Sequence, residues 1–245
     1  MNAATGACPR GFLRAPARLR LPGSGVGVAA YACGFSDDRF NAGLFAEYGI
    51  TEPEVISRSV PRRRAQYLAG RICARQTLRS LSEAAADGQL LIAADRRPMW
   101  PTGFKGSISH CAGMAVAVSC TDCRARGIGV DVEDVLEDHV WLEIGESVVH
   151  GSDREFLTSA SGSLGMAAAR TVLFSAKESF FKSAFGMVGR VFDFDALSLV
   201  RLDVHAGTAT AVVNLDLCRE VRRMDEVEIG FSVVDGLVAT LCILD

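Results

Sequence analysis

Two carboxylates stand two residues apart in the segment from Gly127 to Val135. Apolar residues occupy the even positions from 128 to 132, and small or acidic residues occupy the odd positions, which is the alternation typical of a half-buried β-strand. Asp131 and Glu133 therefore share one face, roughly 6.6 Å apart along the backbone. Oxygen donors at this spacing suit a hard cation such as magnesium, and an exposed acidic strand end is the alternative interpretation.

A second charged group lies in the segment from Thr171 to Phe185, which the pattern predicts to be a mostly buried helix ended by Gly186. Lys177, Glu178 and Lys182 interrupt its apolar and aromatic residues. Glu178 and Lys182 are four residues apart and share a helix face. An exposed ion pair of this kind contributes only about 0.2 to 0.5 kcal/mol. Flanking phenylalanines instead favour the wall of a cleft, where both charges can act on a ligand.

A histidine stands among hydroxyl side chains in the segment Gly106–Cys111. His110 directly follows Ser109, at the border between a loop and a strand expected over residues 114–119. This position would let the imidazole touch a ligand, although a lone histidine is more often structural. The preceding residues 95–101 form a basic segment interrupted by prolines, which indicates irregular structure.

Arginines recur along the clearest helix of the first half, expected over residues 57–81 with Ser59 as its cap and Pro61 in its first turn. Spacings of four and seven place most of them on one face. They are Arg63, Arg64, Arg71, Arg75 and Arg79. A solvated basic face is the usual explanation, but guanidinium groups with few acidic neighbours also make a phosphate cradle.

The remaining elements complete two similar halves, each with strands and one long helix. A strand is expected over residues 25–33, a short helix over 37–48, a capping box at Ser152 to Glu155, a flexible loop over 159–165, and strands from 196 onward with a hairpin turn at Asp235–Gly236. The polar segment 120–126 marks the boundary. We therefore expect an α+β fold with domains 1–125 and 126–245.

Charge is distributed unevenly over the 245 residues, whose net charge is −3. The first 125 residues carry 16 Lys and Arg against 9 acids, and the remainder carries 10 against 20. A basic half and an acidic half suit a polyanionic small ligand held by arginines and by a carboxylate-bound metal. The acidic half and the lack of interleaved aromatic and basic residues argue against nucleic acid.

Composition also bears on location. No apolar run approaches the roughly 18 residues of a membrane-spanning helix, so no stable membrane insertion is expected. The basic N-terminal residues resemble a targeting peptide only superficially, because their apolar part is short and broken by glycine. Eight scattered cysteines fit a reducing cytoplasm, and the lone Cys120–Cys123 pair cannot close a tetrahedral zinc site.

Three motifs together resemble the 4'-phosphopantetheinyl transferases, of the broad-specificity type found in siderophore and polyketide pathways. The motifs are Gly106–His110, Gly129–Glu133 and Phe174–Lys182. With the arginine helix and Trp100–Pro101, the resemblance covers roughly residues 57 to 185. It implies a pseudo-twofold monomer of two similar α+β halves. The N-terminal half would bind the nucleotide and phosphates of coenzyme A, and the C-terminal half would hold the metal site and the catalytic helix.

The resemblance also implies roles for single residues. Asp131, Glu133 and Glu178 would bind magnesium, with manganese as the alternative ion. Glu178 would also remove the proton from the acceptor serine, and Lys182 and His110 would complete the catalytic set. The coenzyme A contacts implied are Arg63, Arg71, Arg97, Ser109, His110, Lys177 and Lys182. Arg97 stands where the family often has lysine before proline, and Arg96 competes for that role.

The implied activity is magnesium-dependent transfer of 4'-phosphopantetheine from coenzyme A to a serine of an apo acyl, peptidyl or aryl carrier protein, with release of adenosine 3',5'-bisphosphate. Such an enzyme serves siderophore, polyketide or non-ribosomal peptide synthesis. A non-catalytic module that binds coenzyme A or a carrier protein is the alternative. The presence of all three motif carboxylates and of Lys182 argues against this alternative.

Overall fold

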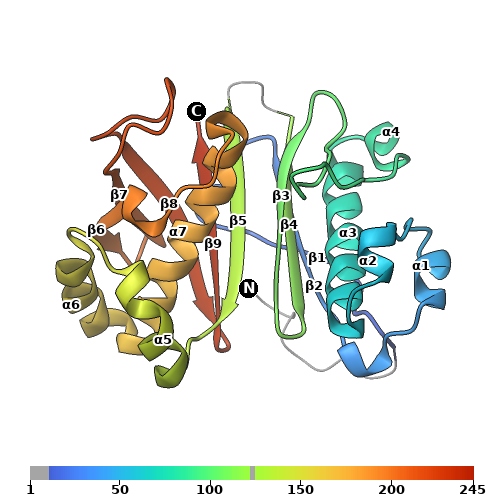
Figure 1. The fold of residues 1–245 in the computed structure, drawn as a ribbon, viewed down its shortest axis with the longest axis horizontal. Helices are drawn as coiled ribbons and strands as arrows, with labels where there is room; N and C mark the ends of the chain where they lie inside the picture. Colours follow the sequence, from blue (N-terminus) through green and yellow to red (C-terminus); the bar gives the residue numbers. More distant parts are fainter. Residues whose placement is uncertain (1–10, 122–124) are drawn as a thin grey trace. The chain divides into compact units, whose positions relative to one another are not determined.

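The computed structural model describes residues 11–121 and 125–245, which form two compact units (Figure 1). One unit contains residues 11–20 and 26–121, and the other contains Leu21–Gly25 and residues 125–245. The expected domain boundary adjoins residues 122–124, which lie outside the described residues, as does Cys123 of the cysteine pair. The described cysteines form no disulfide.

The first unit is a four-stranded antiparallel sheet with one long helix packed on it (Figure 1). The sheet has the order β1-β2-β4-β3, with β1 at Ala17–Arg18, β2 at Val28–Gly34, β3 at Lys105–Cys111 and β4 at Met114–Cys120. The long helix is α3, Pro61–Leu81, and its buried Leu68 and Ala69 share a core with Ala115 and Ala117. Shorter helices are η1 at Asp37–Arg39, α1 at Gly43–Glu47, α2 at Glu54–Ser57 and α4 at Glu83–Ala86.

Two sequence expectations in this unit need correction. Ser59 does not cap α3, because α2 and α3 are separate helices and Val60 takes the cap position, while the Ser59 hydroxyl donates to Val55 O at 3.1 Å. Pro61 does occupy the first turn of α3. His110 lies within β3 rather than at the end of a loop, so its position is fixed by the ladder with β4.

The second unit has a five-stranded antiparallel sheet with the order β5-β9-β8-β7-β6. The strands are β5 at Gly127–Asp134, β6 at Leu197–Asp203, β7 at Thr208–Val213, β8 at Glu226–Val234 and β9 at Leu237–Leu244. The helices are α5 at Asp138–Val148, α6 at Asp153–Leu164, α7 at Met166–Val188 and the short η2 at Phe194–Ala196. The expected hairpin turn at Asp235–Gly236 connects β8 to β9.

Helix α7 lies directly against β5 and β9 (Figure 1). Glycines at two positions of β5 permit this approach: a Cβ at Gly127 would stand 2.0 Å from Ser183 O, and one at Gly129 would stand 1.9 Å from Ser179 O. Only glycine fits there. The alternating small and acidic positions of the strand therefore have a packing role at one end and carry the carboxylates at the other.

The helices of the second unit are longer than the sequence indicates. Helix α7 continues through Gly186 because Met187 and Val188 pack on the core, and this burial exceeds the roughly 1 kcal/mol cost of one helical glycine. It ends at Gly189, whose φ of +69° is left-handed. The flexible loop expected over residues 159–165 is instead mostly the last turns of α6. The expected capping box is also absent, since the Ser152 hydroxyl donates to Leu199 O at 3.1 Å.

Within the described ranges, none of the long helices combines the length and the apolar character that crossing a membrane requires.

Candidate functional site

The acidic cluster of the second unit is built by the register of α7 on β5. Ser183 lies over Gly127 and Ser179 lies over Gly129, so the helix runs opposite to the strand at this contact. The preceding turn of α7, which carries Glu178, therefore comes beside the end of β5 that carries Asp131 and Glu133. The Ser175 and Thr240 hydroxyls lie 2.9 Å apart and hold this turn of the helix against β9.

Lys182 provides the positive charge of this cluster. Its ammonium group donates to Asp131 Oδ1 at 2.6 Å. The Asp131 side chain is only 2% exposed, whereas that of Lys182 is 26% exposed and faces outward in part. The pair therefore joins a buried carboxylate to an ammonium group that a ligand can reach.

The electrostatics of the cluster are dominated by carboxylates. Burial, together with the neighbouring Asp131 and Glu178, raises the pKa of Glu133 to about 8, and Lys182 opposes this shift. Burial also raises the pKa of Glu178, again with Lys182 acting in the opposite direction and Asp131 in the same direction. One ammonium group is thus shared by three acidic side chains, and added positive charge would stabilise their ionised forms.

The cluster is not a finished metal centre. Among the described residues, no three His, Cys, Asp or Glu side chains are arranged as a group that could hold a metal ion. In this structure the ammonium group of Lys182 provides the positive charge next to Asp131. The donor types nevertheless suit a hard divalent cation, because all three acidic side chains offer oxygen and none offers sulfur or nitrogen.

Lys177 points to the other side of α7, where it is buried. Its ammonium group donates to Val148 O at 2.7 Å, to Phe194 O at 2.9 Å and to Asp153 Oδ2 at 2.5 Å. Asp153 also accepts backbone N–H groups from His150 and Leu199, each at 2.8 Å. Burial lowers the pKa of Lys177, and Asp153 opposes the shift. This lysine, next to Glu178 in the sequence, connects α7 to the end of α5, the start of α6 and η2.

A cavity of about 230 Å³ opens beside Glu178. Its lining is mostly aromatic and aliphatic, including Phe181, Val191 and Phe192, and Lys177 and Asp193 also contribute. The Phe181 and Phe192 rings are packed with their centroids 4.9 Å apart. An uncharged chain of a ligand would fit such a lining.

In the first unit, the structure brings Arg63 and His110 together. Arg63 Nη1 lies 2.7 Å from His110 Nε2, and since a guanidinium group can only donate, the imidazole nitrogen accepts. Ser109 is buried in the same strand, β3. The pair connects the first turn of α3 to β3 and presents one cationic and one titratable group together.

Arg71 and Arg97 make contacts of their own. Arg71 is buried, donates from Nε to Leu90 O at 2.9 Å, and stacks 4.4 Å above the centre of the Tyr67 ring. Arg97 pairs with Asp95, with 2.7 Å between Nη2 and Oδ2, in a half-exposed loop. Among the residues expected to contact coenzyme A, Arg63 is thus bonded to His110.

Two parts of the site carry no signal in the sequence. Asp153 looks like an ordinary residue of a helix's first turn, although its carboxylate is fully buried against Lys177. Thr240 lies opposite Asp131 in the ladder between β5 and β9 and fixes α7 through Ser175. Both depend on contacts between segments far apart in the chain.

Comparisons with known proteins match both units. A model of the 4'-phosphopantetheinyl transferase N-terminal domain matches residues 51–120, and a model of the 4'-phosphopantetheinyl transferase superfamily matches residues 127–242. The 4'-phosphopantetheinyl transferase Svp of Streptomyces mobaraensis is 35% identical over 196 residues, which cover 76% of this chain and 74% of Svp.

Two further relatives match a smaller share of this chain. The 4'-phosphopantetheinyl transferase Npt of Nocardia iowensis is 31% identical over 162 residues, covering 64% of this chain and 68% of Npt. Enterobactin synthase component D of Salmonella typhi is 39% identical over 122 residues, covering 50% of this chain and 48% of that protein. The chain thus spans only about half the length of the enterobactin synthase component that it matches.

Proposed function

Because the chain belongs to the 4'-phosphopantetheinyl transferase superfamily, we propose that it transfers 4'-phosphopantetheine from coenzyme A to a serine of an apo carrier protein. A bond forms between the serine oxygen and the phosphorus that carries the pantetheine. The bond from that phosphorus to the bridging oxygen breaks, and adenosine 3',5'-bisphosphate leaves. The observation that carries the proposal is the convergence of Asp131 and Glu133 on β5 with Glu178 and Lys182 on α7.

The acceptor class follows from the names of the relatives. One relative is a component of enterobactin synthase, and two are 4'-phosphopantetheinyl transferases. We therefore propose acyl, peptidyl or aryl carrier proteins of siderophore, polyketide or non-ribosomal peptide synthesis as partners.

The three carboxylates would bind a magnesium ion, since Asp131, Glu133 and Glu178 supply only oxygen donors and carry more negative charge than Lys182 balances. When bound, the ion supplies positive charge to the diphosphate and to its leaving oxygen.

Glu178 would remove the serine proton, directly or through a water molecule. A serine hydroxyl is a poor nucleophile without a base, and burial raises the pKa of this carboxylate, which makes it a stronger base than an exposed one. Lys182 would leave Asp131 in part to neutralise the phosphate nearest the adenosine. Its 26% exposed side chain permits this movement.

The first unit would bind the nucleotide end of coenzyme A. Arg63 and His110 present a preformed pair of phosphate-binding groups, and the stacked Arg71 offers the remaining nitrogens of its guanidinium group. Ser109 and Arg97 would add contacts. Lys177 lines the cavity beside Glu178, and its three bonds to protein oxygens would position this turn of α7.

The uncharged pantetheine chain would lie in the cavity beside Glu178. The aromatic lining supports this placement, because burying a chain of few charges against apolar side chains is favourable.

Intact-mass spectrometry of an apo carrier protein tests the function. Incubation with this chain, coenzyme A and magnesium should add the mass of one phosphopantetheine, and replacing magnesium by a chelator should abolish the addition. A carrier protein that gains no mass, in a sample that binds coenzyme A by calorimetry, would instead support the non-catalytic binding module.

A further inference from the structure

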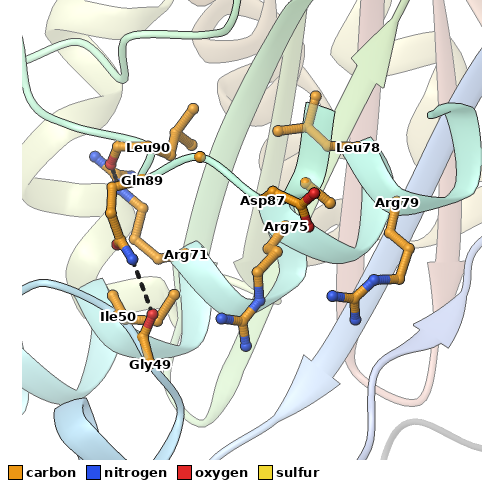
Figure 2. A pocket seen from close by; sticks show the side chains of 11 residues that line it. Gly49, Ile50, Arg71, Arg75, Leu78, Arg79, Asp87, Gln89 and Leu90 are labelled. Atoms are coloured by element: carbon orange, nitrogen blue, oxygen red, sulfur yellow. Dashed lines mark hydrogen bonds between the residues drawn. The ribbon is translucent and has the colours of Figure 1, made fainter. Parts of the chain in front are cut away.

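A second pocket lies in the first unit, along the C-terminal half of α3. It has a volume of about 210 Å³ and is enclosed by α3, by the turn at Gly49–Ile50 and by the segment of residues 86–90 (Figure 2). Arg63, in the first turn of α3, is twelve residues from Arg75, or roughly 18 Å along the helix axis. The pocket is therefore separate from the Arg63 and His110 pair.

Three arginines from successive turns of α3 line this pocket: Arg71, Arg75 and Arg79 (Figure 2). Each is four residues from the next, so their side chains follow one side of the helix. Asp87 is the only acidic residue among the lining residues. Three positive charges thus face one negative charge around a small enclosed volume.

The arginines are held in place by backbone carbonyl groups. Arg71 Nε donates to Leu90 O at 2.9 Å, and Arg75 Nη1 donates to Tyr48 O at 2.7 Å. These bonds fix the guanidinium groups without neutralising their charge. The pair between Arg79 and Glu83 is long, at 3.4 Å, and the Glu83 side chain is 80% exposed, so solvent screens it.

The walls opposite α3 are also fixed. Gln89 Nε2 donates to Gly49 O, and Gln89 Oε1 accepts from Thr51 N, each at 3.0 Å. The segment that follows α4 is thereby connected to the turn that follows α1. Burial and the neighbouring Arg79 lower the pKa of Arg75, because both disfavour its charged form.

We propose that this pocket is a binding site for the phosphate group of a small molecule, recognised by Arg75 and Arg79 with Arg71 at one end. Guanidinium groups bind phosphate oxygens in pairs, and prior fixation of the side chains reduces the entropy lost on binding. The volume is below the roughly 300 Å³ at which whole-ligand pockets begin, which suits a phosphate group with little else attached. The phosphate belongs to a free phosphorylated metabolite, separate from the coenzyme A that the Arg63 and His110 pair would bind.

The test is an NMR titration with inorganic phosphate at constant ionic strength. In the unmodified chain, the amide signals of Gly49, Ile50, Gln89 and Leu90 should shift and saturate. The double variant R75Q/R79Q should bind phosphate at least tenfold more weakly, since each lost guanidinium removes charge-assisted hydrogen bonds. Arg58→Gln, an exposed arginine outside the pocket, serves as the control for the loss of one positive charge and should leave the titration unchanged.

A second variant guards against loss of folding. Arg79→Gln alone removes a half-exposed side chain that holds no backbone group in the structure, and it should still weaken phosphate binding. Titrations with coenzyme A and with 3'-dephospho-coenzyme A then identify the source. If R79Q lowers affinity for neither, the site serves a separate metabolite; if it lowers affinity for coenzyme A alone, the pocket binds the 3'-phosphate of coenzyme A and the proposal fails.

The proposal does not depend on transferase activity, so the failure of one leaves the other standing. Shifts that do not saturate, shifts outside the pocket, or equal affinity for phosphate in R79Q, R75Q/R79Q and the unmodified chain would overturn it.

Discussion

Replacing Lys177 by methionine should destabilise the second unit strongly. The substitution keeps the length of the side chain but removes an ammonium group that is 1% exposed and has three oxygen partners. It leaves the fully buried Asp153 charged, with only backbone N–H groups of His150 and Leu199 as donors. Breaking a buried ion pair by removing one partner costs about 3 to 5 kcal/mol, so the loss of unfolding free energy should lie in this range.

Urea unfolding followed by circular dichroism measures the loss, with Arg154→Met as the control. Arg154 is exposed on α6, and its substitution should change the unfolding free energy by less than about 0.5 kcal/mol. Coenzyme A affinity of the folded K177M protein, measured by calorimetry, should remain close to that of the unmodified chain. Unchanged stability together with weakened coenzyme A binding would refute the positioning role and restore Lys177 as a ligand contact.

Two further changes test the packing of α7 on its sheet. Gly129→Ala places a Cβ 1.9 Å from Ser179 O and should cost about 1 to 3 kcal/mol in thermal unfolding, whereas Gly162→Ala, in open space on α6, should be neutral or stabilising. Burial raises the pKa of Cys242 from its ordinary value of 9.0 to about 12. The folded state therefore keeps a proton that the unfolded state loses, and stability should fall as pH rises above about 9. Urea unfolding between pH 8 and 10 measures this loss. Above pH 9, the unfolding free energy of the unmodified chain should fall with pH by about 1.4 kcal/mol per pH unit more than that of Cys242→Ala. Equal slopes for the two proteins would contradict the raised pKa of Cys242.

The strands of the second unit could be predicted closely from their residues. The alternation around Asp131 gives β5, and the Asp235–Gly236 turn gives the hairpin of β8 and β9. The residue types near helix ends predicted those ends less reliably. Gly186 looks like a stop signal, but core contacts of the residues after it extend α7, because burial outweighs a weak local preference.

The candidate site, like the fold, could be predicted only in part from the sequence. Spacing alone places Asp131 with Glu133, and Glu178 with Lys182, but only the close fit of α7 on the glycines of β5 brings the two pairs together. The sequence gives Lys177 and Lys182 similar weight, because both are single charges in an apolar helix. Their different environments come from Asp153 at the start of α6, which no local pattern connects to α7.

The most direct test of the proposed chemistry is a single-turnover intact-mass measurement with Glu178→Gln. Glu143→Gln, an exposed acid on α5, is the matched control. We expect that E178Q binds coenzyme A by calorimetry but modifies the apo carrier protein at least 100-fold more slowly, since general base catalysis supplies about 10² to 10⁴ in rate. E143Q should react at the unmodified rate. Transfer by E178Q at an undiminished rate would contradict the assignment of this carboxylate, and with it the chemistry proposed for the acidic cluster.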